Sequence, residues 1–190
     1  MIEDLNTLRK TFRFEFGEEI VPRYNISPGQ EILTIGKHEG KRVGAMMRWG
    51  LVPYWAKDPK IGYKMINGRS EGIDKKSSFK NAFKKRRVLI PCSGFYEWKQ
   101  SDEGKLPYRF IMKGQKPFAF AGIWETWTKG EFPLHSCSIL TTQPNGVTKS
   151  VHESDYDIWM DPEYDDISSL MNSLFLMKRR RGTNTVCPPW

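Results

Sequence analysis

A glutamate set among aromatic residues, Glu97 in the stretch F-Y-E-W-K (95–99), is the first candidate for chemistry in this sequence. The apolar run at 88–90 predicts a strand that ends at Pro91, because proline cannot donate to a sheet ladder. A second strand is expected from Phe95 onward, and alternation places Phe95 and Glu97 on one face of it. A carboxyl group held among aromatic rings loses solvation, which raises its pKa and suits general acid/base catalysis. The alternative is a solvated strand glutamate beside a core tryptophan.

The stretch Y-K-M-I-N-G-R-S-E (63–71) supplies a second candidate set. Asn67, Arg69 and Glu71 occupy alternate positions, so in extended backbone their side chains project from one face. An amide, a guanidinium and a carboxylate can together bind and orient a phosphodiester, and they can equally form a surface hydrogen-bond ladder. His152, in S-V-H-E, is a further candidate acid or base, although a single histidine after a loop is more often exposed and uninvolved.

The composition favours a polyanionic partner. The 190 residues carry a formal charge of +8, and aromatic residues make up 13% of them, with seven tryptophans. A basic surface with exposed rings is typical of single-strand binding, because unpaired bases stack on aromatic side chains. The tryptophans can equally belong to the core. The length, together with the absence of a linker or repeat, predicts one domain over residues 1–190.

The three cysteines, Cys92, Cys137 and Cys187, are far apart in the sequence, with no C-x-x-C motif and no histidine cluster. This spacing predicts neither a disulfide framework nor a zinc site, and we expect no metal and no other cofactor. The sequence shows no signal peptide and no apolar run of transmembrane length. We therefore expect a protein of the cytoplasm, outside membranes, with a monomer as the default state.

Hydrophobic periodicity and turn residues predict an α+β fold. Short strands at hairpin spacing, without β-α-β alternation, indicate a mostly antiparallel, partly closed β-barrel-like core with flanking helices. The small residues Ala119, Ala121 and Gly122 mark a strand against which another element packs closely. The expected helices cover 2–12, 77–85 and 167–175. The second is capped by Ser77 or Ser78, with Phe79 and Phe83 one turn apart, and the third is followed by a basic turn at 178–181 and a stop at Gly182.

The expected strands cover 31–35, 41–49, 108–113, 118–127 and 135–142. An aromatic-walled loop is expected at 47–58 and a hairpin turn at 101–105.

Seven motifs occur along the chain in a fixed order: P-R-Y-N-I-S-P-G-Q, M-R-W-G-L-V-P-Y-W-A-K-D, I-N-G-R-S-E, I-P-C-S-G-F-Y-E-W-K, F-A-G-I-W-E, I-L-T-T and V-H-E. Together they resemble the SRAP family, the SOS response-associated peptidase domain, most strongly over residues 23–153. The resemblance implies the SRAP fold and a nucleoid-associated protein of the DNA damage response. Its expected partner is single-stranded DNA that contains abasic sites.

The resemblance also implies a chemistry. Proteins of this family form a thiazolidine between an N-terminal cysteine and the ring-opened sugar aldehyde, which crosslinks protein to DNA, and some act as thiol autopeptidases that expose this cysteine. Carried over motif by motif, Asn67 orients the amino terminus and the sugar, Glu97 is the acid/base, and His152 assists ring opening. The expected DNA channel is lined by Pro28, Trp55, Arg69 and Thr141.

The sequence departs from the family pattern at its start, where Met1-Ile2 stands in place of Met-Cys-Gly-Arg-Phe. Either segments of the protein lie outside residues 1–190, or the chain is a paralogue that binds DNA without crosslinking it. The functions to compare are therefore an abasic-site crosslinking enzyme and a non-covalent single-strand binding module on the same scaffold. A third hypothesis, a peptidase that uses Cys92 with His152, lacks the helix N-terminus or close base that activates a thiol.

Overall fold

The computed structural model describes residues 4–101, 104–142, 148–176 and 185–186. Its helices are α1 (Leu5–Phe12), α2 (Lys80–Lys85), α3 (Tyr156–Met160) and α4 (Ile167–Asn172), and its 3₁₀ turns are η1 (Pro59–Lys64), η2 (Lys113–Gln115) and η3 (Glu153–Asp155). Its strands are β1 (Glu31–His38), β2 (Lys41–Trp49), β3 (Asn67–Arg69), β4 (Arg87–Cys92), β5 (Phe95–Ser101), β6 (Gly104–Phe110), β7 (Phe118–Trp127), β8 (Leu134–Thr141), β9 (Lys149–Val151), β10 (Leu174–Leu176) and β11 (Thr185–Val186).

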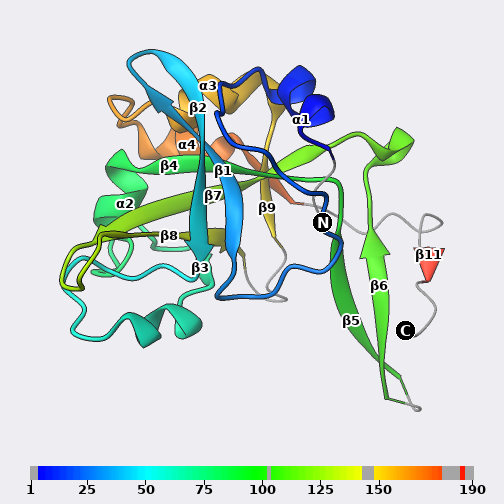
Figure 1. The fold of residues 1–190 in the computed structure, drawn as a ribbon, viewed down its shortest axis with the longest axis horizontal. Coiled ribbons are helices and arrows are strands. Elements are labelled where there is room, and N and C mark those ends of the chain that lie inside the picture. Colours follow the sequence, from blue (N-terminus) through cyan, green and yellow to red (C-terminus); the bar gives the residue numbers. More distant parts are fainter. Residues whose placement is uncertain (1–3, 102–103, 143–147, 177–184, 187–190) are drawn as a thin grey trace.

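Five strands close into a barrel at the centre of the fold (Figure 1). Strand β1 pairs antiparallel with β2 and β4, β4 pairs with β7, and β7 pairs with β8. Closure comes from a parallel pairing of β2 with β8, in which Arg48 lies beside Ser136 and Trp49 beside Cys137. Strand β3 extends the sheet beyond β8, and β9 and β10 extend it beyond β7. The expected α+β barrel is confirmed, and it is fully rather than partly closed.

Local sequence explains how two parts of the barrel form. Glu39 and Gly40, between β1 and β2, both have positive φ (49° and 78°), as a two-residue hairpin turn requires. On β7, a Cβ atom at Gly122 would lie 2.7 Å from Cδ1 of Ile90, so any larger residue there would force the Ile90 side chain to move. The close packing expected from the small residues of this strand is therefore present.

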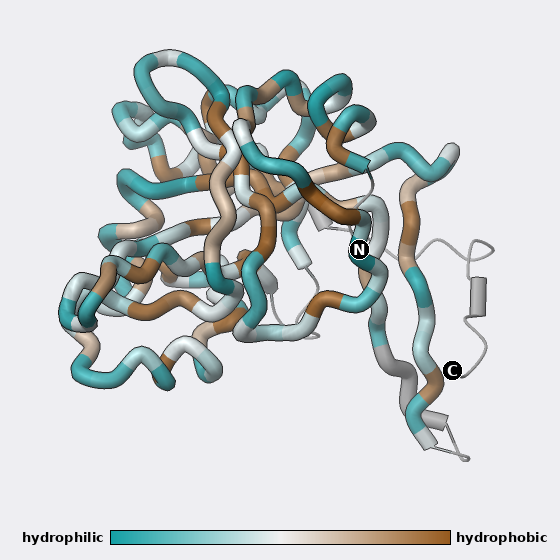
Figure 2. The backbone as a smooth tube through the Cα atoms, viewed as in Figure 1, coloured by the Kyte–Doolittle hydropathy of each residue, from teal (hydrophilic) through white to brown (hydrophobic). Residues whose placement is uncertain are grey.

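Alternation along the strands divides most of the buried apolar side chains into two large clusters, beside a small third one of Val52, Ala56 and Trp127. The inward cluster contains Ile32, Met47, Val88, Phe120 and Ile139. The outward cluster lies under the helices and includes their residues Leu8, Phe12, Phe83 and Trp159. Figure 2 shows hydrophobic stretches along the barrel strands and hydrophilic residues in the surrounding turns.

The N-terminal helix forms as its periodicity predicts. Asp4 caps α1 by accepting a hydrogen bond from Thr7 N at 3.1 Å, and Leu8 and Phe12 are fully buried. Ile2, the first residue of the expected apolar stripe, lies outside the described residues.

A buried arginine ties the barrel to two helices. Arg87 is 3% exposed, and its Nε donates a hydrogen bond to the Trp159 carbonyl at 2.7 Å. Its five N–H groups donate to five backbone carbonyls, those of Phe83, Lys84, Trp159, Asp161 and Tyr164. Several of these carbonyls belong to the last turns of α2 and α3, where helix carbonyls have no partner within the helix.

A two-stranded arm projects from the barrel. Strands β5 and β6 form an antiparallel hairpin, with β11 beside β6, and they extend away from the main sheet (Figure 1). Phe95 anchors the base of the arm: its ring stacks on Phe110 at 5.1 Å and meets Phe118 and Phe120 edge-on at 6.4 and 5.4 Å. Gly104 (φ 117°) begins β6, in agreement with the expected turn, whose residues 102–103 lie outside the described residues.

Three expectations about element ends are wrong. Pro91 does not end the strand, and β4 runs to Cys92. At Pro91, β4 pairs with β7 on one side, while its pairing with β1 on the other side is at Leu89, so the missing N–H of Pro91 breaks no ladder hydrogen bond there. Helix α2 begins later than expected, at Lys80, with Phe79 as an N-cap that makes no side-chain hydrogen bond. Strand β6 spans Gly104–Phe110, because it continues the hairpin from β5 rather than starting at Tyr108.

The last expected helix is also too long. Helix α4 ends at Asn172, and residues 174–176 form β10, which pairs with β9. A tertiary pairing therefore overrides the helical periodicity of Leu174 and Phe175. The basic turn at 178–181 and Gly182 lie outside the described residues. Within the described part of the chain, no helix is long and apolar enough to cross a membrane.

Candidate functional site

Strand β3 carries two of the predicted site residues on one exposed face. Asn67 and Arg69 are exposed, whereas Gly68 between them is buried, as alternation in an extended strand predicts. Arg69 lies beside Thr141 in the parallel pairing with β8, and Ser70 N donates to Thr141 O at 2.8 Å. Thr141 itself is 4% exposed, so its side chain adds little to the surface.

Glu71 does not extend this face as an extended backbone would predict. The strand ends at Arg69, and the chain turns at once, with Ile73 N donating to Ser70 O. The Glu71 carboxylate instead accepts a hydrogen bond from Thr142 Oγ1. The structure thus keeps an amide and a guanidinium together and uses the carboxylate to join the turn to the end of β8.

Two glycines fix the loop that leads from β2 to β3. A Cβ atom at Gly50 (φ 131°) would lie 2.7 Å from Gly62 O, and one at Gly62 would lie 2.5 Å from Gly50 O. The two backbones therefore touch where no side chain could fit. Trp49 Nε1 donates to Ile66 O at 2.9 Å, which fixes the residue immediately before Asn67.

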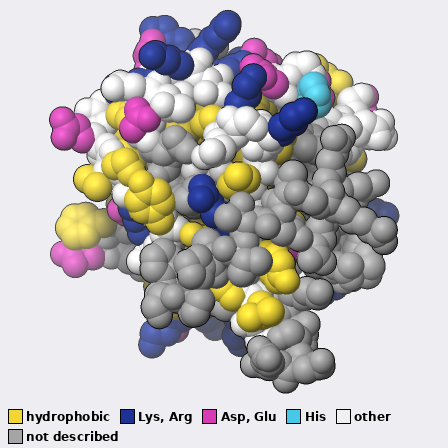
Figure 3. Space-filling view, turned by 90° about the vertical axis from the view of Figure 1, so that its right-hand side faces the viewer, with side chains coloured by type: hydrophobic (Ala, Val, Ile, Leu, Met, Phe, Trp, Pro, Cys, Tyr) yellow, Lys and Arg dark blue, Asp and Glu magenta, His cyan; other side chains and the backbone are white. Residues whose placement is uncertain are grey.

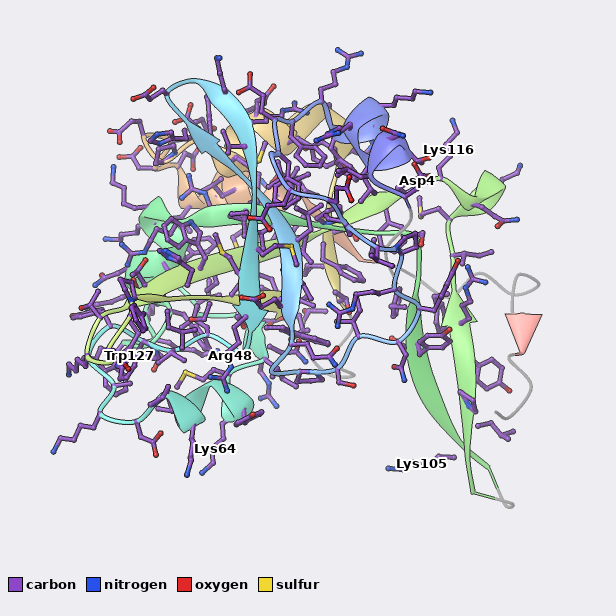
Figure 4. All side chains as sticks on the ribbon, in the orientation of Figure 1. Asp4, Arg48, Lys64, Lys105, Lys116 and Trp127 are labelled. Carbon is purple, nitrogen blue, oxygen red and sulfur yellow. The ribbon has the colours of Figure 1, made fainter. Side chains whose placement is uncertain are left out.

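An exposed aromatic ring beside an arginine lies next to this loop. The guanidinium carbon of Arg48 lies 5.0 Å from the centre of the Tyr63 ring, and the ring is 59% exposed. The turn that contains the exposed Pro28 packs on the same ring, since a Cβ atom at Gly29 would lie 2.9 Å from Tyr63 Cε1. Figure 4 shows Arg48 above the segment that carries Lys64.

The sequence predictions did not include Tyr63 or Arg48 in the site. The alternation of lysine with an aromatic residue in K-I-G-Y-K (60–64) could have suggested Tyr63. The partnership with Arg48 joins two segments whose contact the sequence alone does not show.

Trp55 lies at the other end of the loop. It is 41% exposed, its carbonyl accepts from Lys129 Nζ at 2.8 Å, and the next carbonyl, of Ala56, accepts from Trp127 Nε1 at 2.8 Å. In Figure 4 Trp127 lies well apart from Arg48. These hydrogen bonds tie the Trp55 backbone to the end of β7 and the segment after it, whereas Tyr63 contacts Arg48 of β2.

Glu97 lies on the projecting arm. It is exposed on β5, opposite Tyr108 of β6, rather than buried among its aromatic neighbours as the sequence suggested. Phe95, two residues earlier, stacks on Phe110 and meets Phe120 edge-on at the base of the arm. Figure 3, which faces the side on which the arm projects, shows hydrophobic side chains next to Lys and Arg side chains on this surface.

His152 follows β9 directly and is exposed. Its Nδ1 is 2.9 Å from Ser154 Oγ, and Ser154 Oγ donates to Asp155 Oδ1 at 3.0 Å. Its backbone N–H donates to Ser173 O at 3.4 Å, which ties the histidine to the segment between α4 and β10. The ring is thus held at the surface by a short local chain of polar groups.

The elements of the three predicted catalytic residues connect to the middle of β7, two of them directly and one through β8. Phe120 of β7 contacts Phe95 of the arm and pairs with Ser150 of β9, while Gly122 pairs with Ile139, the neighbour of Asn67 on β3. The arm that carries Glu97 and the strand before His152 are therefore both anchored at Phe120 of β7, and the strand that carries Asn67 is held one strand farther away, through β8.

The described cysteines are poor nucleophiles. Cys92 and Cys137 are buried and free, and burial raises the pKa of the Cys92 thiol to about 12 and the pKa of Cys137 further still. Among the residues that the structure describes, no group of three His, Cys, Asp or Glu side chains is placed to hold a metal ion.

Comparisons with known proteins identify relatives. The family model "SOS response associated peptidase (SRAP)" matches residues 1–184. The chain is 45% identical over 137 residues to the abasic site processing protein YoqW of Bacillus subtilis, and this alignment covers 71% of this chain and 61% of that protein. It is 29% identical over 163 residues to the abasic site processing protein HMCES of Xenopus tropicalis, covering 70% of this chain and 49% of that protein.

A solved structure supports the fold. The crystal structure of a Bordetella bronchiseptica protein superposes with a TM-score of 0.76 at 21% identity, covering 95% of this chain and 92% of that one. The present chain spans about three fifths of the length of the Bacillus relative and about half of the Xenopus relative.

Proposed function

Because the chain belongs to the SOS response associated peptidase (SRAP) family, we propose that it processes abasic sites in single-stranded DNA. The relatives named above are abasic site processing proteins. The observation that carries the proposal is the surface formed by the Pro28 turn, Tyr63 and strand β3, where an exposed ring lies among basic side chains.

This surface has the two components that single-strand binding needs. Tyr63 is 59% exposed and offers ring surface on which a base can stack, and the Arg48 guanidinium over the ring holds it in place. Arg69 and Lys64 are exposed nearby and supply positive charge for phosphates. Trp55 would meet the strand farther along, at the outer end of the loop.

We assign the chemical steps to Asn67, Glu97 and His152. An amine attacks the aldehyde carbon of the ring-opened sugar, water leaves, and a thiol adds to the resulting imine to close a thiazolidine. Glu97 would donate the proton that the departing hydroxyl needs and accept one from the amine, His152 would move the proton for ring opening, and Asn67 would orient the sugar. The amine and thiol of this step come from an N-terminal cysteine in the family, and the same thiol would serve the autopeptidase activity.

A peptidase that uses Cys92 is not proposed. The thiol is buried with a pKa of about 12, so almost none of it is thiolate at neutral pH. Native Cys92 should stay unlabelled by iodoacetamide and become labelled in urea.

The alternative is a non-covalent single-strand binding module, favoured by one observation. The surface of Arg48, Tyr63 and Arg69 is complete in the described residues and needs no nucleophile to bind DNA. Both functions share this surface, so they differ only in whether a covalent adduct forms.

Intact mass spectrometry separates the two functions. The native protein is weighed before and after incubation with a uracil-excised oligonucleotide. A stable adduct supports processing by crosslinking, whereas tight binding without any adduct supports the binding module.

The role of Glu97 is tested by rate. Glu97→Gln should slow adduct formation by about 10²-fold or more, because the amide cannot exchange a proton. The control is Glu131→Gln, at an exposed position between β7 and β8. An unchanged rate in Glu97→Gln would remove Glu97 from the mechanism.

A further inference from the structure

A cavity of about 330 Å³ lies within the barrel, at the end toward the β1–β2 turn. Inward-facing residues of all five barrel strands line it, among them Thr34, Ala45, Met47, Val88, Trp124 and His135. This volume is at the lower end of the range for cavities that bind small molecules.

The cavity is separate from the proposed DNA surface. The Pro28 turn precedes the start of β1 at Glu31, whereas the cavity is lined by Thr34, Gly36 and His38, toward the end of the same strand. At about 3.3 Å per residue, Thr34, the first lining residue of β1, lies roughly 10 Å along the strand from Glu31, and Met47 of the lining precedes Arg48 but points to the opposite face of β2. The proposal below therefore does not depend on DNA processing.

The floor and one wall of the cavity suit a flat apolar group. Met47 and Val88 are 7% and 1% exposed and form an apolar floor. The half-buried Trp124 presents an indole beside His135, and the two rings meet edge-on at 6.0 Å. His135 Nδ1 is 3.0 Å from Thr126 Oγ1, which holds the imidazole in this orientation. An aromatic ring can thus pack on the indole, with apolar contact beneath it.

The charge around the cavity is positive. Lys37, Lys85 and Arg87 line it, and none of its described lining residues is acidic. Lys37 pairs with the half-buried Asp161 at 2.9 Å, which offsets its charge, whereas the Lys85–Glu163 pair at 3.4 Å is exposed to solvent and therefore weak.

The individual cations contribute differently. Arg87 uses all its donors on backbone carbonyls, so it adds positive potential without offering a hydrogen bond. Lys85, His38 and His135 are exposed around the opening and can reach a ligand there.

We propose that this cavity binds a small planar aromatic carboxylate. The ring lies against Trp124 over Met47 and Val88, and the carboxylate remains at the opening, where Lys85 and the histidines offer N–H donors. Apolar enclosure supplies affinity for the ring, and the positive opening selects an anion over a cation of the same shape.

Calorimetry with two probes of matched shape tests the proposal. The probes are 1-naphthoate and 1-naphthylmethylammonium, titrated into the full chain. Naphthoate should bind at least tenfold more tightly than the ammonium compound. Equal affinities, or no heat with either probe at millimolar concentration, would overturn the proposal.

Two variants locate the probe. Ala45→Phe fills the cavity and should weaken naphthoate at least tenfold, and Lys85→Glu should weaken it several-fold while strengthening the ammonium probe. Lys116→Glu makes the same charge change at an exposed position away from the lining and is the control. If Ala45→Phe does not fold, Lys85→Glu decides: an affinity equal to that of Lys116→Glu refutes the site.

Competition distinguishes the cavity from the DNA surface. A single-stranded oligonucleotide should leave naphthoate affinity unchanged. Displacement of naphthoate by the oligonucleotide would place the probe on the DNA surface and would also overturn the proposal.

Discussion

Arg87 offers the sharpest test of how the barrel is joined to its helices. The variant Arg87→Met keeps an unbranched apolar stem and removes the guanidinium. Five backbone carbonyls then lose their donors together, including those of Phe83 and Trp159, to which the hydrogen bonds measure 2.7 Å. Trp159 is fully buried and its indole donates to Val88 O at 3.0 Å. In the variant, helix α3, which carries Trp159, would lose the hydrogen bond that Arg87 makes to the Trp159 carbonyl.

The magnitude follows from the number of acceptors left behind. A buried polar group that loses its partner lowers the free energy of unfolding by about 1–3 kcal/mol. Removing the guanidinium also removes the free-energy penalty of burying its charge, which offsets part of this loss. Breaking such a buried charged network typically costs about 3–5 kcal/mol, and we expect about 4 kcal/mol for Arg87→Met. Arg87→Lys should fall between the variant and the wild type, because an ammonium has three donors for five acceptors.

The assay is urea unfolding followed by tryptophan fluorescence and by far-UV circular dichroism. Arg42→Met is the matched control: this guanidinium is partly exposed and donates at 2.8 Å to both Asp157 and the Phe12 carbonyl. We expect it to cost only about 1 kcal/mol. If Arg87→Met loses no more free energy of unfolding than Arg42→Met, the assigned role of Arg87 is wrong.

Three further outcomes are expected. Arg69→Ala should weaken single-strand binding and reduce the slope of log K against log salt by about one, measured by fluorescence anisotropy; an unaltered slope would mean that Arg69 does not touch phosphate. Gly62→Ala should displace Tyr63 and weaken DNA binding by about tenfold, because its methyl group would lie 2.5 Å from Gly50 O, whereas Gly17→Ala, in open space, should have no such effect. Burial raises the pKa of Cys92 from 9.0 to about 12, so the unfolded chain alone releases this proton above pH 9, and stability falls as the pH rises from 9 toward 12. In urea titrations from pH 8.5 to 10.5, Cys92→Ala should reduce that fall by about 1 kcal/mol per pH unit on average, and an unchanged slope would contradict the assignment.

Local patterns predicted local structure well. The helix at α1 and the β1–β2 hairpin follow from apolar spacing and from the turn between the two strands. The wrong predictions at Pro91 and Leu174 depend on partner strands. Pro91 stays in β4 because β4 pairs there with β7, and Leu174 joins β10 because it pairs with the edge of β9.

In the candidate site, too, local patterns could be predicted from the sequence and long-range contacts could not. Alternation along β3 predicted that Asn67 and Arg69 share an exposed face. The exposure of Glu97 could not be read from its aromatic neighbours in the sequence, because the one ring shown to pack on the barrel, that of Phe95, lies at the base of the arm, two residues before the exposed glutamate. The contact of Arg48 with Tyr63 depends on the backbone approach of Gly50 and Gly62, which no short motif encodes.

The parallel pairing of β2 with β8 has a consequence for the order of folding. The strands that close the barrel, Lys41–Trp49 and Leu134–Thr141, are separated by more than eighty residues of chain. Such a distant contact carries a large loop-closure entropy and forms late. During synthesis the β1–β2 hairpin must therefore wait with one edge unpaired until β8 leaves the ribosome, and in that interval it is most exposed to aggregation.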